Sequence, residues 1–391
     1  MSAPRIYLVS AEASGDAIAG DLIDALRALD PDVEIAGVGG PETAARGVTS
    51  LFDISELSVF GIFDGLKIAK LVHQRAEEVA EAAAEFGADA VVLIDSWGFM
   101  LRAAWKLEDR LPDVPRIKYV APQVFASRRG RAKIAADHFS HLLAIHPFDA
   151  PYFEPHGLKV SFVGNPALER DLSGDGAGFR RRHGIGADQQ ALLVLFGSRN
   201  SELTRLFEPF ADAVRRLRAE RPDLALVTAL APSIEERARE MIANEPAFAD
   251  LVIAGPGERR DAYNAADAAL ACSGTVTVEL ARIGIPTVAA YRLGWLAWAA
   301  ARLWLMKAKY ISLANLAADE MLIPEYVQTK CTGPRLASAI GAMLDDPDRR
   351  ARLSQRLTAV TREMAGDGGS PSRNAAEAVL AIARQKKAGE A

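Results

Sequence analysis

The chain has 391 residues, of which 50% are hydrophobic and 25% are charged, which predicts two soluble globular domains. Its formal net charge of −5 gives no support for a nucleic-acid partner, and its two cysteines exclude a disulfide scaffold and suit a reducing cytoplasm. The first five residues run directly into a predicted strand, and no run of about 20 apolar residues occurs, so we expect neither a signal peptide nor a spanning helix.

The first half of the chain is predicted to alternate strands with helices. Strands are expected at residues 6–10, 33–38, 90–94, 117–121, 142–146 and 160–163. Helical segments between them predict a mostly parallel sheet that is covered on both faces and binds ligands outside the carboxyl ends of its strands. The glycine turn at residues 37–41 lacks the spacing of a dinucleotide fingerprint.

The second half repeats this pattern, with strands expected at residues 192–196, 224–230, 251–254, 268–271 and 286–290. We predict a first domain over 1–171, a glycine-rich linker over 172–190 and a second domain over 191–366. The last segment, 367–391, contains a helix that could lie back across the first domain. The expected fold class is α/β, with two doubly wound Rossmann-like domains that face a cleft.

Two glycine turns in the second half predict an anion site. Residues 197–199 and 273–275 each follow a short apolar strand and lead into a helix. Backbone N–H groups and the helix dipole favour an anion there, and Arg199 suits phosphate oxygens, so we expect a diphosphate. Glu279, one turn into the second helix, could accept ribose hydroxyls. The alternative is that both turns are ordinary helix caps.

Carboxylates at predicted strand ends mark the first half, at Glu12, Asp16 and Asp95. The sequence has no G-x-S-x-G elbow, H-E-x-x-H motif or Walker loop, which argues against α/β-hydrolases, metalloproteases and P-loop enzymes. We expect no metal, because the two Asp-Pro-Asp triplets sit in helix-exit turns. This layout suits a transferase that takes a sugar from a nucleoside diphosphate, with a carboxylate that accepts a proton from the acceptor hydroxyl.

Two stretches are more apolar than an ordinary surface. Residues 57–72 are apolar nearly all round a predicted helix and include Phe60 and Phe63, while residues 293–309 place Trp295 and Trp298 on one helical face beside basic residues. Tryptophan beside Arg and Lys suits the membrane–water boundary, so we expect membrane contact here. Core packing is the alternative for both stretches, and a dimer face is a further one for the second.

Several motifs occur in an order that is specific to one family. They are Ala11-Glu12-Ala13-Ser14-Gly15-Asp16, Gly37-Val38-Gly39-Gly40-Pro41, Leu57-Ser58-Val59-Phe60-Gly61, Ile94-Asp95-Ser96, Tyr119-Val120-Ala121-Pro122, Phe162-Val163-Gly164, Gly197-Ser198-Arg199 with Glu202, Ser273-Gly274-Thr275 with Glu279, Tyr291-Arg292, and Tyr310-Ile311-Ser312-Leu313-Ala314-Asn315-Leu316. From about residue 6 to 327 the chain resembles the lipid-A-disaccharide synthases, glycosyltransferases of the GT-B fold.

The resemblance implies inverting transfer of a diacylglucosamine unit from UDP-2,3-diacylglucosamine to 2,3-diacylglucosamine 1-phosphate, with release of UDP, in lipid A biosynthesis. It implies no cofactor and a cytoplasmic location, peripheral on the inner membrane. The implied UDP-sugar residues are Gly197, Ser198, Arg199, Glu202, Ser273, Gly274, Thr275, Glu279, Tyr291, Arg292 and Asn315. The implied acceptor-side residues are Glu12, Ser14, Gly15 and Gln123.

The departures from the family pattern all fall on the acceptor side. The family usually has a second aspartate three residues after Asp95, where this chain has Gly98. Residues 122–128 lack the usual tryptophans, and a usual Gly-His pair is Gly164-Asn165. We therefore predict Asp95 as the catalytic base, with Asp16 as second choice. The alternative role of Asp95 is an N-cap for the following helix.

Two other functions stay open on the sequence alone. A paralogue that transfers to another lipid, or that binds a nucleotide sugar without the family reaction, would explain the missing aspartate. A UDP-GlcNAc epimerase would share the fold and the nucleotide site, but the apolar stretches argue against it.

Overall fold

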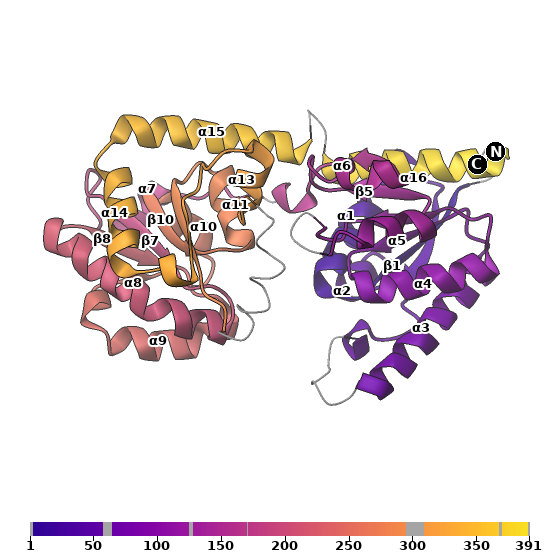
Figure 1. Cartoon of the computed structure of the whole chain (residues 1–391), viewed down its shortest axis with the longest axis horizontal. Coiled ribbons are helices and arrows are strands. Elements are labelled where there is room, and N and C mark those ends of the chain that lie inside the picture. The colour runs from indigo at the N-terminus through magenta and orange to yellow at the C-terminus, as the bar shows by residue number, and fades with distance from the viewer. Residues whose placement is uncertain are drawn as a thin grey trace. The chain divides into compact units, whose positions relative to one another are not determined.

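The computed structural model describes residues 3–57, 65–124, 128–169, 171–294, 309–366 and 370–389, without the side chains of residues 65–69. The chain divides into two compact units, Met1–Glu169 with Met364–Ala391, and Arg170–Glu363. Each unit has a six-stranded sheet whose paired strands are parallel (Figure 1). The first unit is therefore built from both ends of the chain.

The sheet of the first unit has the strand order β2-β1-β3-β4-β5-β6. Its strands are β1 (Arg5–Ser10), β2 (Glu34–Val38), β3 (Ala90–Ile94), β4 (Arg116–Tyr119), β5 (His141–Ala144) and β6 (Lys159–Phe162). Strands β1 and β3 are mostly apolar and buried on both faces, which is typical of a parallel sheet. Leu93 of β3 pairs with Lys118 of β4, so these two strands end side by side.

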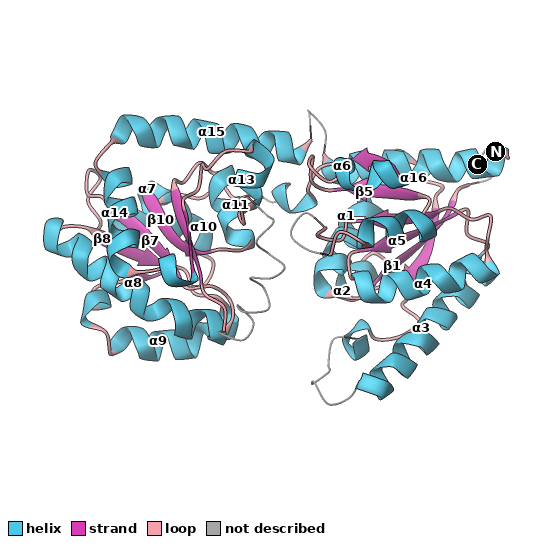
Figure 2. Ribbon diagram, viewed as in Figure 1, coloured by secondary structure: helices cyan, strands magenta, loops and turns pink. Residues whose placement is uncertain are grey.

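Helices cover both faces of this sheet (Figure 2). They are α1 (Ala13–Leu29), α2 (Pro41–Ala44), α3 (Gly65–Phe86), α4 (Trp97–Arg110), α5 (Arg131–His138), α6 (Ala150–Phe153) and α16 (Pro371–Ala388), with short 3-10 helices at Ile54–Leu57, Glu154–His156 and Pro166–Leu168. Helices α1 and α16 pack together on one face, and α3, α4, α5 and α6 pack on the other. Apolar side chains on these helices and on the strands form the two core layers.

The second unit has the strand order β12-β11-β10-β7-β8-β9. Its strands are β7 (Ala191–Leu195), β8 (Ala225–Thr228), β9 (Val252–Ile253), β10 (Ala268–Cys272), β11 (Thr287–Tyr291) and β12 (Glu325–Val327). The sequence analysis predicts all of these except β12. The carboxyl ends of β7, β10 and β11 are neighbours in this order, which brings the turns after them to one edge of the sheet.

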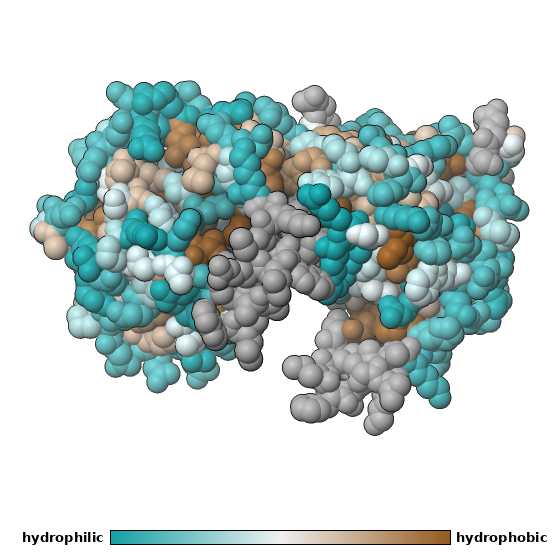
Figure 3. Space-filling model, in the orientation of Figure 1, coloured by the Kyte–Doolittle hydropathy of each residue, from teal (hydrophilic) through white to brown (hydrophobic). Residues whose placement is uncertain are grey.

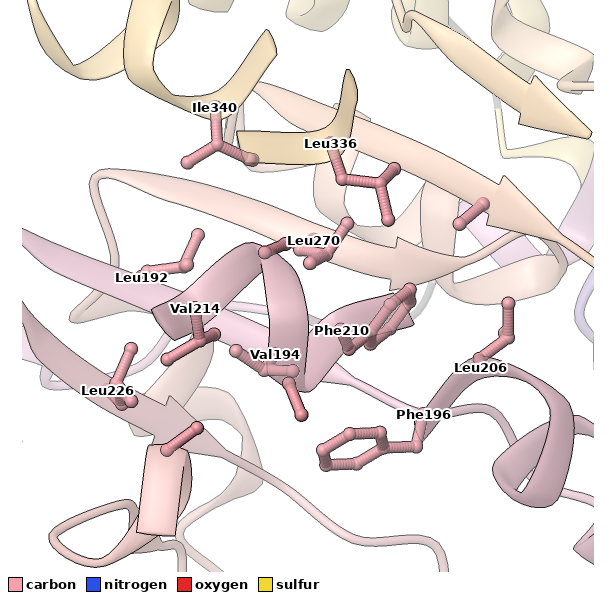
Figure 4. Close-up of a cluster of buried hydrophobic side chains, with 14 of the residues drawn as sticks. Leu192, Val194, Phe196, Leu206, Phe210, Val214, Leu226, Leu270, Leu336 and Ile340 are labelled. Carbon is pink, nitrogen blue, oxygen red and sulfur yellow. The ribbon is translucent and has the colours of Figure 1, made fainter. Parts of the chain in front are cut away.

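The helices of the second unit again form two layers. They are α7 (Gly176–Arg182), α8 (Asn200–Glu220), α9 (Glu235–Ala243), α10 (Arg259–Asn264), α11 (Thr275–Arg282), α13 (Leu313–Ala318), α14 (Gly333–Leu344) and α15 (Pro347–Ala365), with short 3-10 helices at Pro232–Ile234, Pro246–Phe248 and Gln328–Lys330. Figure 4 shows Phe210 and Val214 of α8, and Leu336 and Ile340 of α14, among the strand side chains of the core. Helices α7, α10 and α11 cover the opposite face.

The structure differs from the expected linker over 172–190. Part of this segment is α7, whose Phe179 is completely buried and belongs to a core layer of the second unit. Gly176 serves close packing, because a Cβ there would lie 2.2 Å from the carbonyl oxygen of Asn264 in α10. Glycine here lets two helices approach each other.

The four residues that we expected to contact a membrane, Phe60, Phe63, Trp295 and Trp298, lie outside the described residues. Within the part of the chain that the structure describes, no helix is both long and apolar enough to cross a bilayer. On the face drawn in Figure 3, hydrophilic residues are spread over both units, and the hydrophobic areas between them are small and separate.

Candidate active site

Asp95 lies one residue beyond the carboxyl end of β3 and faces the start of α1. The hydroxyl of Ser14, in the first turn of α1, donates a hydrogen bond of 2.7 Å to Oδ2 of Asp95. The start of α1 lies directly against this turn, since a Cβ at Gly15 would be in ordinary contact with the carbonyl oxygen of Ile94, at 3.4 Å, and with Cβ of Asp95, at 3.5 Å. The structure thus brings together three residues that the sequence analysis assigns to the acceptor side or to catalysis.

The alternative role of Asp95, as an N-cap of α4, is wrong. Ser96 occupies the N-cap position, and its side chain makes no capping hydrogen bond to this helix. Asp95 and Ser96 both have left-handed backbones, with φ of 57° and 21°. A non-glycine residue adopts such a φ only where the surrounding structure imposes it, and pairs of this kind gather at functional sites.

Asp16 is held as a structural residue, not as the second catalytic candidate that we had expected. Its carboxylate is 1% exposed and accepts hydrogen bonds from the backbone N–H groups of Gly40 (2.7 Å), Glu42 (2.8 Å) and Thr43 (3.2 Å). These groups belong to the start of α2, whose positive dipole end favours a carboxylate. Asp16 therefore ties α1 to the glycine turn that follows β2.

We expect Asp16→Ala to lower the free energy of unfolding by about 2 to 4 kcal/mol, because three backbone donors lose a charged acceptor. Urea denaturation measures this loss, and Asp24→Ala is the control, since Asp24 also lies in α1 but makes an exposed ion pair with Arg46. The control should change the stability by less than about 1 kcal/mol. A variant with full stability and no turnover would instead return Asp16 to the group of catalytic residues.

The other two acceptor-side residues, Glu12 and Gln123, have exposed side chains. Glu12 occupies the N-cap position of α1 without a side-chain capping bond, and its carbonyl oxygen accepts the N–H of Asp16. Gln123 lies in the loop after β4. Both positions follow the carboxyl end of a strand, as predicted for ligand contacts in a parallel sheet.

Lys118 is a residue of this site that the sequence analysis missed. Its side chain is 1% exposed, and Nζ donates hydrogen bonds to the carbonyl oxygens of Asp95, Leu93 (3.3 Å) and Tyr119 (3.2 Å). Burial lowers the pKa of this ammonium to about 7, while the carboxylates of Asp95 and Glu12 act in the opposite direction. The available signal was a lysine inside the predicted strand 117–121, in which it is the single charged residue.

In the second unit, Glu202 organises the turn between β7 and α8. Its Oε2 accepts the backbone N–H groups of Ser198 (3.0 Å) and Arg199 (3.2 Å), and its Oε1 lies 3.2 Å from Nη1 of Arg199. Gly197 has a φ of 98°, and a Cβ there would lie 2.5 Å from the Glu202 carboxylate. Glu202 therefore has a capping role, whereas the Arg199 side chain is 75% exposed and accessible to a ligand.

The turn between β10 and α11 is open. Ser273 donates its backbone N–H to the carbonyl of Ala290 (2.9 Å), and Gly274 precedes the first residue of α11, Thr275. Gly274 has an extended backbone with φ of 170°, and a Cβ there would meet no atom within 4 Å. The fold thus places no demand for glycine at this position, and the backbone of the turn is exposed.

The carboxylate of Glu279, in α11, is already paired. Nη2 of Arg259 lies 3.0 Å from it, and Nε of the same guanidinium donates to the hydroxyl of Tyr263 at 2.7 Å. The sequence analysis did not select Arg259. The positive charge of Arg259 therefore lies at the start of α10, next to the negative charge of Glu279 in α11.

Tyr291 and Arg292, at the end of β11, differ in what they can offer a ligand. Burial raises the pKa of Tyr291, and the negative charge of Glu202 raises it further. Arg292 is turned into the protein, because its guanidinium donates to the backbone carbonyls of Cys331 and Arg205. Arg292 therefore supports the site from within.

Asn315 does not face a ligand, contrary to our expectation. It is completely buried. Its Nδ2 donates hydrogen bonds to the carbonyl of Ile323 (2.7 Å) and to Oε1 of Glu325 (2.9 Å), and its Oδ1 accepts the N–H of Ile323 (2.8 Å). Glu325, in the unpredicted strand β12, also accepts the N–H groups of Ile311 and Ser312. Asn315 and Glu325 together hold the segment before α13 in place.

A family model described as Lipid-A-disaccharide synthetase matches residues 6–380. The chain belongs to the lipid-A-disaccharide synthase family. Its relatives include the lipid-A-disaccharide synthases of Rhodospirillum centenum, 41% identical over 96% of this chain and 94% of that protein, and of Paramagnetospirillum magneticum, 39% identical over 98% of each. Membership of this family confirms the predicted resemblance and makes the chain a glycosyltransferase.

Solved structures agree on the fold. The S. aureus MnaA-UDP co-structure matches with a TM-score of 0.62 and 13% identity, covering 99% of this chain and 98% of that chain. MurG of Acinetobacter baumannii matches with a TM-score of 0.60 and 14% identity, covering 97% and 99%. With the two parallel six-stranded sheets, these matches confirm the predicted α/β fold class of the GT-B type.

Proposed function

We propose that this chain transfers a diacylglucosamine unit from UDP-2,3-diacylglucosamine to 2,3-diacylglucosamine 1-phosphate, with inversion at the anomeric carbon and release of UDP. The observation that carries the proposal is the family match over almost the whole chain, with synthases 41% and 39% identical to it. A UDP-linked donor is further supported by the fold shared with S. aureus MnaA, whose matching structure is a complex with UDP.

The proposed reaction forms one bond and breaks one. The acceptor hydroxyl oxygen attacks C1 of the donor sugar, and the bond from C1 to the diphosphate oxygen breaks, so its electron pair leaves with UDP. The proton of the hydroxyl passes to the carboxylate of Asp95, which the Ser14 hydroxyl orients. Attack on the face opposite the leaving diphosphate inverts the configuration at C1.

The second unit would bind the leaving UDP. Arg199, with its exposed guanidinium, and the open turn at Gly274 would contact the diphosphate, where charge develops during the transfer. Tyr291 and the pair of Glu279 with Arg259 would line the nucleotide side. The polar atoms of three further residues make hydrogen bonds to backbone groups of the protein, so these residues would position the site without contacting UDP. They are Glu202, Arg292 and Asn315.

A membrane location follows from the proposed substrates, because both carry acyl chains. The apolar stretches at residues 57–72 and 293–309 support peripheral contact with a lipid surface. We place this contact on the cytoplasmic face of the inner membrane, where Phe60, Phe63, Trp295 and Trp298 would enter the interface.

The test is to incubate purified protein with UDP-2,3-diacylglucosamine and to measure UDP and disaccharide, with and without 2,3-diacylglucosamine 1-phosphate. UDP release that requires the acceptor, with an equal amount of disaccharide, supports the proposal. Conversion of UDP-GlcNAc without any acceptor would point to an epimerase instead. Binding of UDP without transfer to any lipid would mean that the chain has lost the family reaction.

We expect Gly274→Ala to weaken UDP binding about tenfold, because the added methyl keeps the diphosphate away from the backbone N–H groups at the start of α11. Isothermal titration calorimetry measures the affinity. Gly130→Ala is the matched control, since a Cβ at Gly130 also meets no atom within 4 Å and its φ of −59° suits alanine. Equal UDP affinity in both variants would remove the turn at Gly274 from the proposed site.

A further inference from the structure

We propose that Lys118 is a positioning residue for Asp95, and that its buried ammonium holds the backbone turn from which the Asp95 carboxylate meets the acceptor. The inference rests on the proposed function for its catalytic meaning. Its structural part concerns only the first unit and can be tested without any reaction.

The position of Lys118 is costly for a lysine. Strand β4 lies inside the sheet, between β3 and β5, and Ile117 and Tyr119 on either side of Lys118 are completely buried. The buried ammonium loses its hydrating water, so hydrogen bonds to atoms of the protein have to replace it. A fully buried lysine of this kind requires acceptors close to its ammonium.

The acceptors are three backbone carbonyls that meet at the ends of two strands. They belong to Leu93 in β3, to Tyr119 in β4 and to Asp95 just beyond β3. A protonated ammonium has three N–H donors and no acceptor, so its donors match these three oxygens in number. The contact therefore joins the ends of two strands to the turn that carries the catalytic carboxylate.

The turn itself needs such a support. Asp95 and Ser96 have φ of 57° and 21°, which are unfavourable for residues with a side chain. The ammonium binds the carbonyl between these two residues, and its charge lies near the carboxylates of Asp95 and Glu12. Lys118 thus opposes relaxation of the turn, and relaxation would move the carboxylate away from Ser14 and from the acceptor.

The first experiment replaces the lysine with a side chain of similar length and no charge. In Lys118→Met we expect kcat for disaccharide synthesis to fall about tenfold, because a small displacement of a base is enough to slow proton transfer. UDP affinity and the donor KM should stay within about twofold of the wild type, because the substitution changes no residue that is proposed to bind the donor. Lys133→Met, an exposed change in α5, is the control and should alter none of these values.

The second experiment separates positioning from a general loss of structure. Glycine adopts a positive φ without strain, so the double variant Lys118→Met with Ser96→Gly should regain a large part of the lost kcat. Ser96→Gly alone should stay close to the wild type. A loss in Lys118→Met that glycine does not restore, or an unchanged kcat in Lys118→Met, overturns the inference.

A crystal structure of Lys118→Met gives a readout that needs no turnover. We expect Asp95 and Ser96 to leave the left-handed region and the hydrogen bond from Ser14 to Asp95 to be lost. An unchanged turn in that structure overturns the inference even if the variant is slow. A wild type that transfers no sugar overturns the proposed function instead, and the crystal structure then still decides the role of Lys118.

Discussion

Asp95→Asn is expected to lower the turnover of disaccharide synthesis by about 10² to 10⁴-fold, the usual contribution of a positioned general base. Asparagine keeps the shape of the side chain and can still accept the hydrogen bond from Ser14, but it cannot take up a proton. UDP affinity should not change, because the proposed nucleotide site lies in the other unit. Steady-state kinetics and calorimetry on the same preparation measure both quantities.

Two further variants test the assignment of Asp95 as the base. Asp109→Asn, an exposed change near the end of α4, should leave turnover unchanged. Gly98→Asp restores the family's second aspartate, and a side chain fits there because a Cβ would meet only Nη1 of Arg102, at 3.9 Å. If Asp95 is the base, Gly98→Asp brings no large gain. Full activity of Asp95→Asn, or a large gain in Gly98→Asp, contradicts the assignment.

Arg199→Ala is expected to weaken UDP binding by about 1.5 to 3 kcal/mol, or roughly 10- to 150-fold, the loss typical of a charge-assisted hydrogen bond. The fold should remain intact, because the Arg199 side chain is 75% exposed and Glu202 keeps its bonds to the backbone of the turn. Calorimetric titration with UDP measures the loss, and thermal melting without ligand checks the fold.

Arg216→Ala serves as the control for Arg199→Ala. Arg216 lies in α8, the helix that Arg199 precedes, and its ion pair with Asp212 is also at the surface. Removing it takes away one positive charge without touching the turn after β7, so the UDP affinity should be that of the wild type. If both variants lose affinity equally, the effect of Arg199 reflects the overall charge of the unit and not a contact with the diphosphate.

The strands were predictable because their physical signal is local. Runs such as residues 90–94 and 191–195 are continuously apolar, and in the structure they are buried on both faces of a sheet. Strand β12 was missed because it has three half-buried residues, Glu325–Val327, and its pairing with β11 leaves no pattern in the sequence. A short strand at the edge of a sheet forms through hydrogen bonds to the adjacent strand, and its own sequence does not predict it.

The residues of the site were predictable by position but not by role. Asp16, Asn315 and Glu202 lie in motifs of the family, yet each uses its polar atoms on backbone groups of the protein. A sequence shows that a polar residue is present, but it does not show whether its partner is a ligand or a distant part of the chain. Lys118 was missed because two of its three partners, the carbonyls of Leu93 and Asp95, belong to another strand and to the turn after it.

The place of α16 affects how the protein is made. Apolar residues of this helix, such as Val379 and Leu380, complete a core layer together with strands from the first residues of the chain. A ribosome releases the α16 segment only after it has synthesised the whole second unit, so the second unit can fold while the first still lacks this helix. Until α16 has been synthesised, the strand side chains that it will cover are accessible to chaperones.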